Sequence, residues 1–300
     1  MGRIWLQVLF LSLLLVEVGF SATRVFVDEV GRWVKVPDPP KRIVSLSPSI
    51  TEILFSLGLE ERIVGVSNHS DFPLQALAKP RVGSYINPNV ERTISLNPDL
   101  ILATAAGNPR EFVDRMESLG LSVYTVFPKD FDGILSSISH IAMVTGREHC
   151  GARVVREMTS RKEKILQLTR DRTKPKVFFQ IGTAPIVTVG KGSFADDLIS
   201  LAGGRNVAGG ESMKYPRYSI EEILVKAPDV IIITSMNPRG DSQKLAEEWI
   251  RWETIPAVKQ GRVFVIDSDL VDLPSPRIIE GLEVIARMLH PELKGILRNQ

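Results

Sequence analysis

Cysteine and histidine are scarce in this 300-residue chain, which contains one cysteine and four histidines. A single thiol, Cys150, cannot form an internal disulfide or, by itself, a structural zinc site, and we expect it to be a partly buried helix residue. Stability must therefore come from an apolar core, for which 44% hydrophobic residues suffice. No His-x-x-x-His spacing occurs, which argues against a catalytic zinc site and against a binder of bare zinc or manganese; the histidines stand at positions 69, 140, 149 and 290.

An excess of charge of one sign is also missing. The 37 Lys and Arg residues nearly balance the 35 Asp and Glu residues, and no run of Lys and Arg forms a basic stripe. These features argue against a protein that binds nucleic acid.

The motifs of common enzyme classes are incomplete. Gly190-Lys-Gly-Ser193 resembles part of a phosphate-binding loop, but Pro185 occupies the position of the first glycine and Gly192 separates the lysine from the serine. Gly65-Val-Ser67 begins like a nucleophile elbow, but His69 replaces its second glycine. We therefore expect that the protein is not an enzyme.

One long hydrophobic run is present, at the start of the chain. Arg3 precedes it, the apolar stretch extends from Ile4 to Phe20, and small residues offer a cleavage site after Ser21. This pattern is typical of a secretory signal peptide over residues 1–21. An uncleaved membrane anchor is the alternative, although Glu17 would be costly in lipid. Because the residue directly after the cleavage site is Ala22 and not a cysteine, we expect no lipid anchor and a soluble mature protein in the periplasm.

Two segments of the chain resemble each other. Residues 91–104 align with residues 221–234 at an offset of 130 (221 minus 91), and each has Glu at the start of a short amphipathic helix, then Pro-Asp, then an apolar run. Such a run between helical patterns predicts a buried parallel strand. Upstream of each segment lies a strand that leads into a helix ending at glycine: residues 42–58 in the first half and 176–203 in the second. The two pairs together predict two α/β lobes of related plan.

A different kind of segment lies between the lobes. From about residue 148 to 170 there is no proline, and apolar residues recur at spacings of three and seven. This pattern predicts one amphipathic helix on the order of 30 Å long. We therefore expect an N-terminal lobe over residues 22–147, an interlobe helix over 148–170 and a C-terminal lobe over 171–300. A helical connection is stiff, so we expect only modest closure of the lobes.

The start of the mature chain, Arg24 to Ser49, predicts a hairpin turning at Glu29 to Gly31, a proline-rich turn and a strand. It resembles the start of periplasmic binding proteins for cobalamin, haem and iron–siderophore complexes, and the resemblance extends over essentially the whole mature chain. The resemblance implies two Rossmann-like α/β lobes joined by one long helix, and delivery of a captured ligand to an ABC importer. Several motifs favour the cobalamin-binding branch: Ser47-Pro-Ser-Ile-Thr-Glu52, Gly65-Val-Ser-Asn-His-Ser-Asp-Phe-Pro73, Gly83-Ser-Tyr85, Asn89-Val-Glu91, Tyr215-Pro216 and Ser275-Pro-Arg-Ile-Ile279.

Tyr85 and Tyr215 each precede a matched glutamate by six residues (91 minus 85; 221 minus 215), so they occupy equivalent places, one per lobe. The resemblance implies that both pack on the ligand, whereas Tyr taken alone is also common in cores. The resemblance also implies a ligand contact at His69, which is otherwise a histidine of a surface loop. The remaining candidates for contacts with the ligand rim lie in loops at the predicted cleft edge: Pro48, Ser49 and Asp269.

Other positions depart from the cobalamin-binding pattern. Thr104 and Ile181 stand where a cobalamin binder has large aromatic residues, and Leu273 stands where it has arginine. Two alternatives therefore stay open. In a haem carrier, Tyr85 or Tyr215 would serve as an axial ligand to iron. In a ferric-siderophore carrier, Arg217 near the second tyrosine would bind an anionic chelate.

Glu91 and Glu221 begin the two matched helices. The helix dipole favours an acidic residue there by about 0.3–1 kcal/mol, which explains one such residue better than two at equivalent places. The resemblance implies that the pair contacts arginines on the two copies of the importer's membrane subunit. We expect the protein itself to be a monomer without a cofactor.

Overall fold

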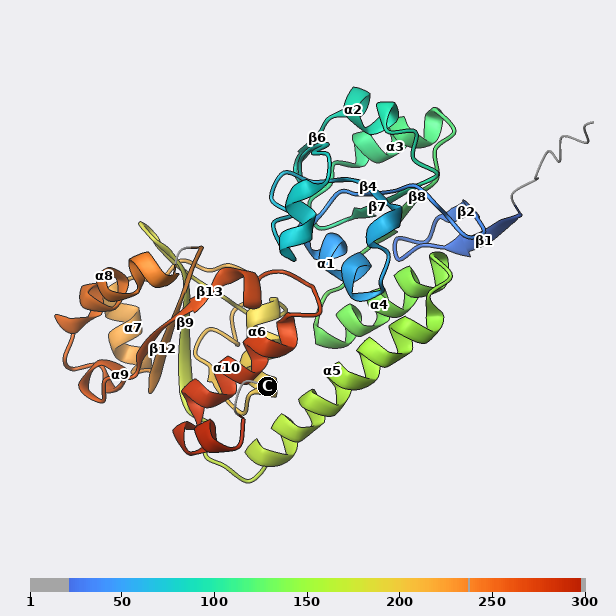
Figure 1. Ribbon diagram of the computed structural model, residues 1–300. Helices are drawn as coiled ribbons and strands as arrows, with labels where there is room; N and C mark the ends of the chain where they lie inside the picture. The colour runs from blue at the N-terminus through green and yellow to red at the C-terminus, as the bar shows by residue number, and fades with distance from the viewer. Residues whose placement is uncertain (1–21, 237, 298–300) are drawn as a thin grey trace, which may run out of the picture.

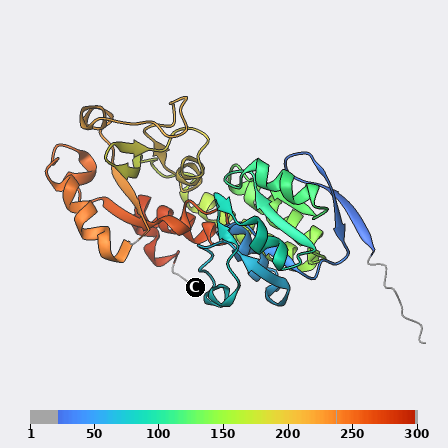
Figure 2. The same ribbon diagram turned by 90° about the horizontal axis from the view of Figure 1, so that it is seen from above.

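The computed structural model of the chain describes residues 22–236 and 238–297, so the predicted signal peptide over residues 1–21 lies outside the described residues. The described chain forms two α/β lobes connected by one long helix, α5 (Glu148–Thr169), as Figure 1 shows. Seen from above, the two lobes lie side by side (Figure 2). This architecture confirms the fold class predicted from the sequence.

The N-terminal lobe is built on a parallel sheet with the strand order β4-β3-β7-β8. Its strands are continuous apolar runs because helices cover both faces of the sheet. Ile43 lies in the core on the side of α1 and α4, whereas its neighbour Val44 lies in the core on the side of α3. The elements are β3 (Ile43–Ser45), α1 (Pro48–Ser56), β4 (Ile63–Val66), α2 (Val90–Ser95), β7 (Leu100–Thr104), α3 (Arg110–Ser118), β8 (Val123–Val126) and α4 (Phe131–Val144).

Two small hairpins accompany this sheet. The first pairs β1 (Thr23–Val27) with β2 (Trp33–Pro37) around a turn in which Gly31 has a φ of 85°, and it confirms the predicted N-terminal hairpin. The second pairs β5 (Gly83–Ser84) with β6 (Asn87–Pro88) and carries Tyr85 at its tip.

The C-terminal lobe has a mixed sheet with the order β10-β9-β12-β13, and β11 pairs with β9 at one end. Helices α6 and α10 cover one face, and α7, α8 and α9 cover the other. The elements are β9 (Lys176–Thr183), β10 (Ile186–Thr188), α6 (Phe194–Leu201), β11 (Arg205–Asn206), α7 (Ile220–Lys226), β12 (Val230–Ser235), α8 (Pro238–Ile250), α9 (Pro256–Lys259), β13 (Val263–Asp267) and α10 (Ile278–Leu289), with 3₁₀ turns at Glu60–Arg62, Leu74–Ala78, Ser268–Leu270 and Pro291–Gly295 along the chain.

The sequence duplication corresponds to a structural one. In the first lobe β3 pairs in parallel with β7, and in the second β9 pairs in parallel with β12. Asn97 follows α2 and Ala227 follows α7, each six residues after its matched glutamate, and both have a φ of 45°. A left-handed residue reverses the chain at a helix end, so both halves turn from helix into strand in the same way.

Helix α5 packs against both lobes. Gly151 allows its first turns to approach α4 so closely that an added Cβ would lie 2.4 Å from the Cβ of Ala142. Farther along, Met158 and Ile165 belong to a core cluster that includes residues of both lobes. Because the helix contributes to this shared core, it is an integral part of the fold rather than a free linker.

Candidate functional site

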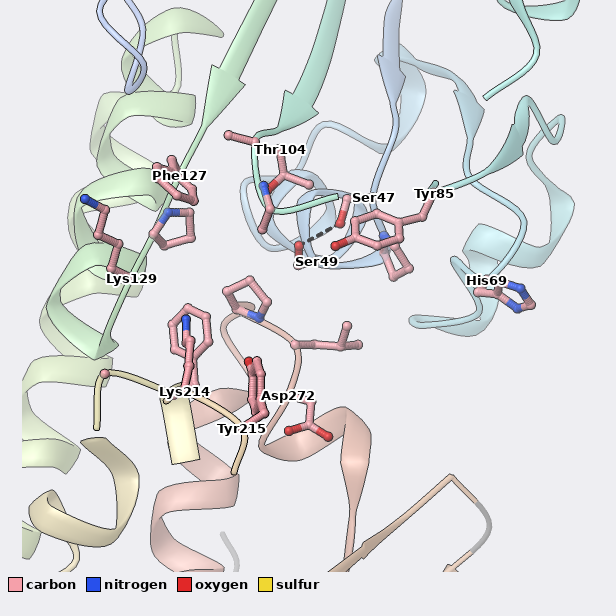
Figure 3. Close-up of a pocket in the computed structure, with 18 residues that line it drawn as sticks. Ser47, Ser49, His69, Tyr85, Thr104, Phe127, Lys129, Lys214, Tyr215 and Asp272 are labelled. Carbon is pink, nitrogen blue, oxygen red and sulfur yellow. Dashed lines mark hydrogen bonds between the residues drawn. The ribbon is translucent and has the colours of Figure 1, made fainter. Parts of the chain in front are cut away.

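A cleft of about 800 Å³ lies between the two lobes. Loops that follow strand ends in both lobes form its walls, as is usual for ligand sites in open α/β sheets. Figure 3 shows the lining side chains of both lobes facing the same space. The lining residues are Ser47, Pro48, Ser49, His69, Tyr85, Thr104, Ala105, Ala106, Phe127, Pro128 and Lys129 of the N-terminal lobe, and Gly192, Phe194, Lys214, Tyr215, Asp272, Leu273 and Pro274 of the C-terminal lobe.

Tyr85 is held in the cleft by a buried asparagine and a glycine. The Nδ2 atom of Asn108 donates to the carbonyl oxygens of Tyr85 at 2.7 Å and Leu46 at 3.1 Å, and its Oδ1 accepts from the amide of Thr104 at 2.7 Å. One side chain thus joins three loops of the cleft wall. The Tyr85 ring lies against Gly107, where an added Cβ would lie 1.8 Å from the tyrosine Cζ.

Tyr215 is held by main-chain pairing instead. The amide of Thr188 donates to the carbonyl of Pro216 at 3.0 Å, and the amide of Gly190 donates to the carbonyl of Lys214 at 2.9 Å. These bonds lie on both sides of Tyr215, so they fix its backbone. The tyrosine itself is 50% exposed, which leaves it open to the cleft.

The surroundings of each tyrosine raise the pKa of its phenol. Burial raises the pKa of the Tyr85 phenol, and the nearby Tyr215 adds to the increase. Burial also raises the pKa of Tyr215, with a smaller contribution from Asp272. Both side chains are therefore neutral phenols near pH 7, each able to donate a hydrogen bond and to offer a ring face.

The other predicted contact residues fall in different places. Pro48 and Ser49 line the cleft at the start of α1, where the Ser49 hydroxyl lies 2.9 Å from that of Ser47 (Figure 3). His69 lines the cleft at its margin. Asp269 is not among the lining residues; its carboxylate lies 3.8 Å from the guanidinium of Arg277. Asp272, three residues later, lines the cleft in its stead.

Sequence reasoning missed several lining residues, among them Phe127 and Phe194, which supply aromatic surface. Their position after strand ends was a usable signal, but loops of this kind are too numerous for position alone to select them. Of the residues that depart from the cobalamin-binding pattern, Thr104 and Leu273 line the cleft. Ile181 lines an adjoining cavity of about 490 Å³ that shares Phe194, Tyr215 and Asp272 with the cleft.

The charges of the cleft are separated. Lys129 and Lys214 lie toward one end, Asp272 lies toward the other, and Tyr215 stands between Lys214 and Asp272 (Figure 3). Within the described residues neither lysine forms an ion pair; each ammonium lies over a neighbouring ring, that of Phe127 or Tyr215. The side chain of Asp272 opens onto the cleft, but the surrounding protein partly shields its carboxylate from water. This desolvation raises the carboxyl pKa to about 6, and the charge of Asp269 adds to the increase.

Glu91 and Glu221 are exposed in the first turns of α2 and α7. In neither helix does this glutamate cap the amino terminus. The side chain of Asn89 caps α2, and Ser219 caps α7 in a capping box with Glu222. Local helix capping therefore does not explain the matched pair.

Neither a metal site nor a membrane-spanning helix is found among the described residues. No group of three or more His, Cys, Asp or Glu side chains there is arranged to hold a metal ion. Among the same residues no helix combines the length and apolarity needed to cross a bilayer.

Two α/β lobes with a cleft of ligand size between them and one connecting helix define a solute-binding protein. The chain belongs to the periplasmic binding protein family, which it matches over residues 43–270. This is a family of binding proteins rather than of enzymes.

Individual relatives agree with this assignment. The chain is 31% identical over 254 residues to a vitamin B12-binding protein of Vibrio cholerae, covering 84% of this chain and 90% of the relative. The crystal structure of the periplasmic vitamin B12-binding protein BtuF of Vibrio cholerae matches with a TM-score of 0.74 at 30% identity, covering 87% of this chain and 99% of that one. The periplasmic haem-binding protein BhuT, in complex with two haems, matches with a TM-score of 0.75 at 25% identity over 84% of this chain and 99% of that one.

Proposed function

We propose that this protein is the substrate-binding component of an ABC importer, and that it captures cobalamin or a related corrinoid in the cleft between its lobes. The observation that carries the proposal is the pair Tyr85 and Tyr215, one from each lobe, facing a common cleft of about 800 Å³. A corrinoid is a broad ring that needs apolar and aromatic surface for its faces and a few polar groups for its rim. The vitamin B12-binding relatives support this ligand class.

The polar groups of the cleft suit the rim of cobalamin. Cobalamin carries neutral amide arms that donate hydrogen bonds, and one anionic phosphodiester in its nucleotide loop. Asp272 accepts from amide donors at one end of the cleft, and Lys129 and Lys214 attract the phosphodiester at the other. His69, Pro48 and Ser49 complete the contacts that we propose. Asp269 does not line the cleft and acts on it through Asp272, whose carboxyl pKa its charge helps to raise.

Haem is the second candidate, because a haem-binding protein is among the structural neighbours. Axial coordination of iron by tyrosine uses the phenolate. Burial raises the pKa of both Tyr85 and Tyr215, which opposes that form. Binding of haem through either tyrosine would therefore have to displace a phenol proton whose pKa is raised.

The proposed setting is the periplasm, after removal of residues 1–21, with the protein acting as a monomer. Glu91 and Glu221 would contact the two copies of the importer's membrane subunit, one per lobe. Both are exposed and neither is used to cap its helix. Charged pairs at an interface rim mainly orient docking and raise the association rate.

A parallel titration tests the proposal. The purified mature protein is titrated with cyanocobalamin, haemin and a ferric siderophore, followed by tryptophan fluorescence and calorimetry. Saturable one-to-one binding of cyanocobalamin alone, at about 1 μM or tighter (about −8 kcal/mol), is the expected result. Tight binding of haemin or the siderophore instead would retain the transport role but overturn the corrinoid assignment.

A further inference from the structure

A bidentate ion pair between Glu52 and Arg277 joins the two lobes. Glu52 belongs to α1 of the N-terminal lobe, and Arg277 directly precedes α10 of the C-terminal lobe, 225 residues later. The Nε atom of Arg277 donates to Oε2 of Glu52 at 2.9 Å, and its Nη2 donates to Oε1 at 2.5 Å. Glu52 and Arg277 each belong to a motif named in the sequence analysis, Ser47 to Glu52 and Ser275 to Ile279, but neither residue lines the cleft.

This ion pair is shielded from water. The Glu52 side chain is only 4% exposed and the Arg277 side chain 15%. Two parallel hydrogen bonds between guanidinium and carboxylate give a fixed relative geometry as well as attraction. A buried carboxylate that loses its cation is strongly destabilised, so any movement that separates the lobes here must also hydrate Glu52.

Arg277 makes a further contact with the N-terminal lobe. Its guanidinium carbon lies 4.0 Å from the centroid of the Phe72 ring, a cation–π arrangement. Phe72 follows His69 by three residues in the same loop, and His69 lines the cleft. Arg277 therefore touches the loop that bears His69 as well as the helix that begins at the cleft edge with Pro48 and Ser49.

We propose that Arg277 is a positioning residue that latches the two lobes and thereby sets the width of the cleft. It contacts Glu52 and Phe72 of the opposite lobe without lining the cleft itself. Each residue of the latch is three positions along the chain from a residue that lines the cleft: Glu52 from Ser49, and Arg277 from Pro274. By holding the lobes at one separation before the ligand binds, it reduces the conformational entropy that the protein loses when a ligand contacts both lobes. This inference holds for any ligand of the cleft.

The test measures lobe geometry directly. With Cys150→Ser as background, spin labels are placed at Arg115→Cys in α3 and Val225→Cys in α7, both exposed and in different lobes. Interlobe distances are then compared for wild type, Arg277→Gln, Glu52→Gln and the double variant. We expect a broader distance distribution in Arg277→Gln, and a loss of cyanocobalamin affinity of about tenfold in the unlabelled variant. The double variant should lose no more than the worse single variant, because the residues act as one unit.

A matched control separates positioning from general stability. Arg32 bonds the buried carboxylate of Asp28 at 2.6 Å and 3.0 Å within the N-terminal lobe. Arg32→Gln should lower the melting temperature without broadening the interlobe distances, and Arg277→Lys should partly restore both distances and affinity. Unchanged distances in folded Arg277→Gln and Glu52→Gln would overturn the latch. If the wild type binds no cyanocobalamin, the proposed ligand fails while the distance measurement still decides the latch.

Discussion

The ring of Tyr85 lies directly against the backbone of Gly107. An added Cβ at Gly107 would lie 1.8 Å from Cζ and 2.0 Å from the hydroxyl oxygen of the tyrosine. No side chain can share that space with the ring. We therefore expect Gly107→Ala to displace Tyr85 and to weaken cyanocobalamin binding about as much as Tyr85→Ala does, by at least about tenfold. Calorimetric titration of both variants measures the effect.

Gly210 provides the control for this prediction. A Cβ there would meet no atom within 4 Å, so Gly210→Ala should bind like the wild type. Tyr85→Phe, which retains the ring, should keep most of the affinity. Wild-type binding by Gly107→Ala would show that the Tyr85 ring does not contact the ligand where it now lies.

The two cleft lysines should respond to the charge of the ligand. If Lys129 and Lys214 attract the phosphodiester of cobalamin, Lys129→Gln/Lys214→Gln should lose about tenfold in affinity for cyanocobalamin, with a weaker dependence on salt. Its affinity for cobinamide, a corrinoid without the nucleotide loop, should change little. Equal losses for both ligands would exclude the phosphodiester as the partner of the lysines.

Asp272 should make binding depend on pH near 6. Its carboxyl pKa is raised to about 6, chiefly by burial, so it is largely protonated at pH 5 and ionised at pH 7. Because the carboxylate accepts hydrogen bonds from ligand amides better than the neutral acid does, cyanocobalamin affinity should rise as the pH increases through 6. Asp272→Asn should flatten this profile. A wild-type profile that falls or stays flat between pH 5 and 7 would contradict the role.

His140 should contribute stability mainly at low pH. Its Nδ1 lies 3.0 Å from Oε1 of Glu29, and this hydrogen bond raises the histidine pKa above its usual value. A raised pKa in the folded state gives stability that is fully present below the unfolded pKa of about 6.5 and is lost as pH rises through the folded pKa. The histidine is 42% exposed, so solvent screening limits the contribution to at most about 1 kcal/mol.

Urea denaturation of His140→Gln tests whether His140 stabilises the fold mainly at low pH. The variant should be less stable than the wild type at pH 5.5 and nearly equal to it at pH 9. His149, which lies on α5, gives a control histidine whose replacement by Gln should not create this difference. An equal loss at both pH values would mean that shape rather than charge matters at His140.

Glu91 and Glu221 should matter for transport and not for ligand binding. Glu91→Ala/Glu221→Ala should bind cyanocobalamin like the wild type but support several-fold slower uptake by reconstituted importer, since rim charges mainly affect association. Glu111 is an exposed glutamate in the first turn of α3 and provides the control, because Glu111→Ala should leave uptake unchanged. Normal uptake by the double variant would remove these residues from the docking surface.

The duplicated halves were predictable because their signals are local. A glutamate, Pro-Asp and an apolar run recur 130 residues apart, and each repeat specifies a helix, a reversal and a buried strand through periodicity and turn chemistry alone. The uninterrupted amphipathic pattern that predicts the interlobe helix is equally local, and the structure has that helix at Glu148–Thr169. The two-lobed architecture could therefore be predicted from local sequence patterns, without knowledge of long-range contacts.

The cleft was only partly predictable because its members meet across distant parts of the chain. Tyr85 and Tyr215 were selected because they occupy equivalent positions in the repeat and because the resemblance to cobalamin-binding proteins implies a ligand contact there. Phe127, Lys214 and Asp272 obey no such regularity, since a loop residue reaches the cleft only through the direction its loop takes. Asp269 and Asp272 illustrate this point: three residues apart in one loop, one faces Arg277 and the other faces the cleft.

By itself, the sequence determined the two-lobed plan, the connecting helix and the paired tyrosines, because patterns within and between short segments encode them. The tertiary structure alone decided the polarity of the cleft and the pairing of Glu52 with Arg277. Burial of a carboxylate and the approach of its cation depend on how two separately folded lobes come to rest against each other. No local sequence pattern specifies how close Glu52 and Arg277 lie, because that separation depends on the packing of the two lobes.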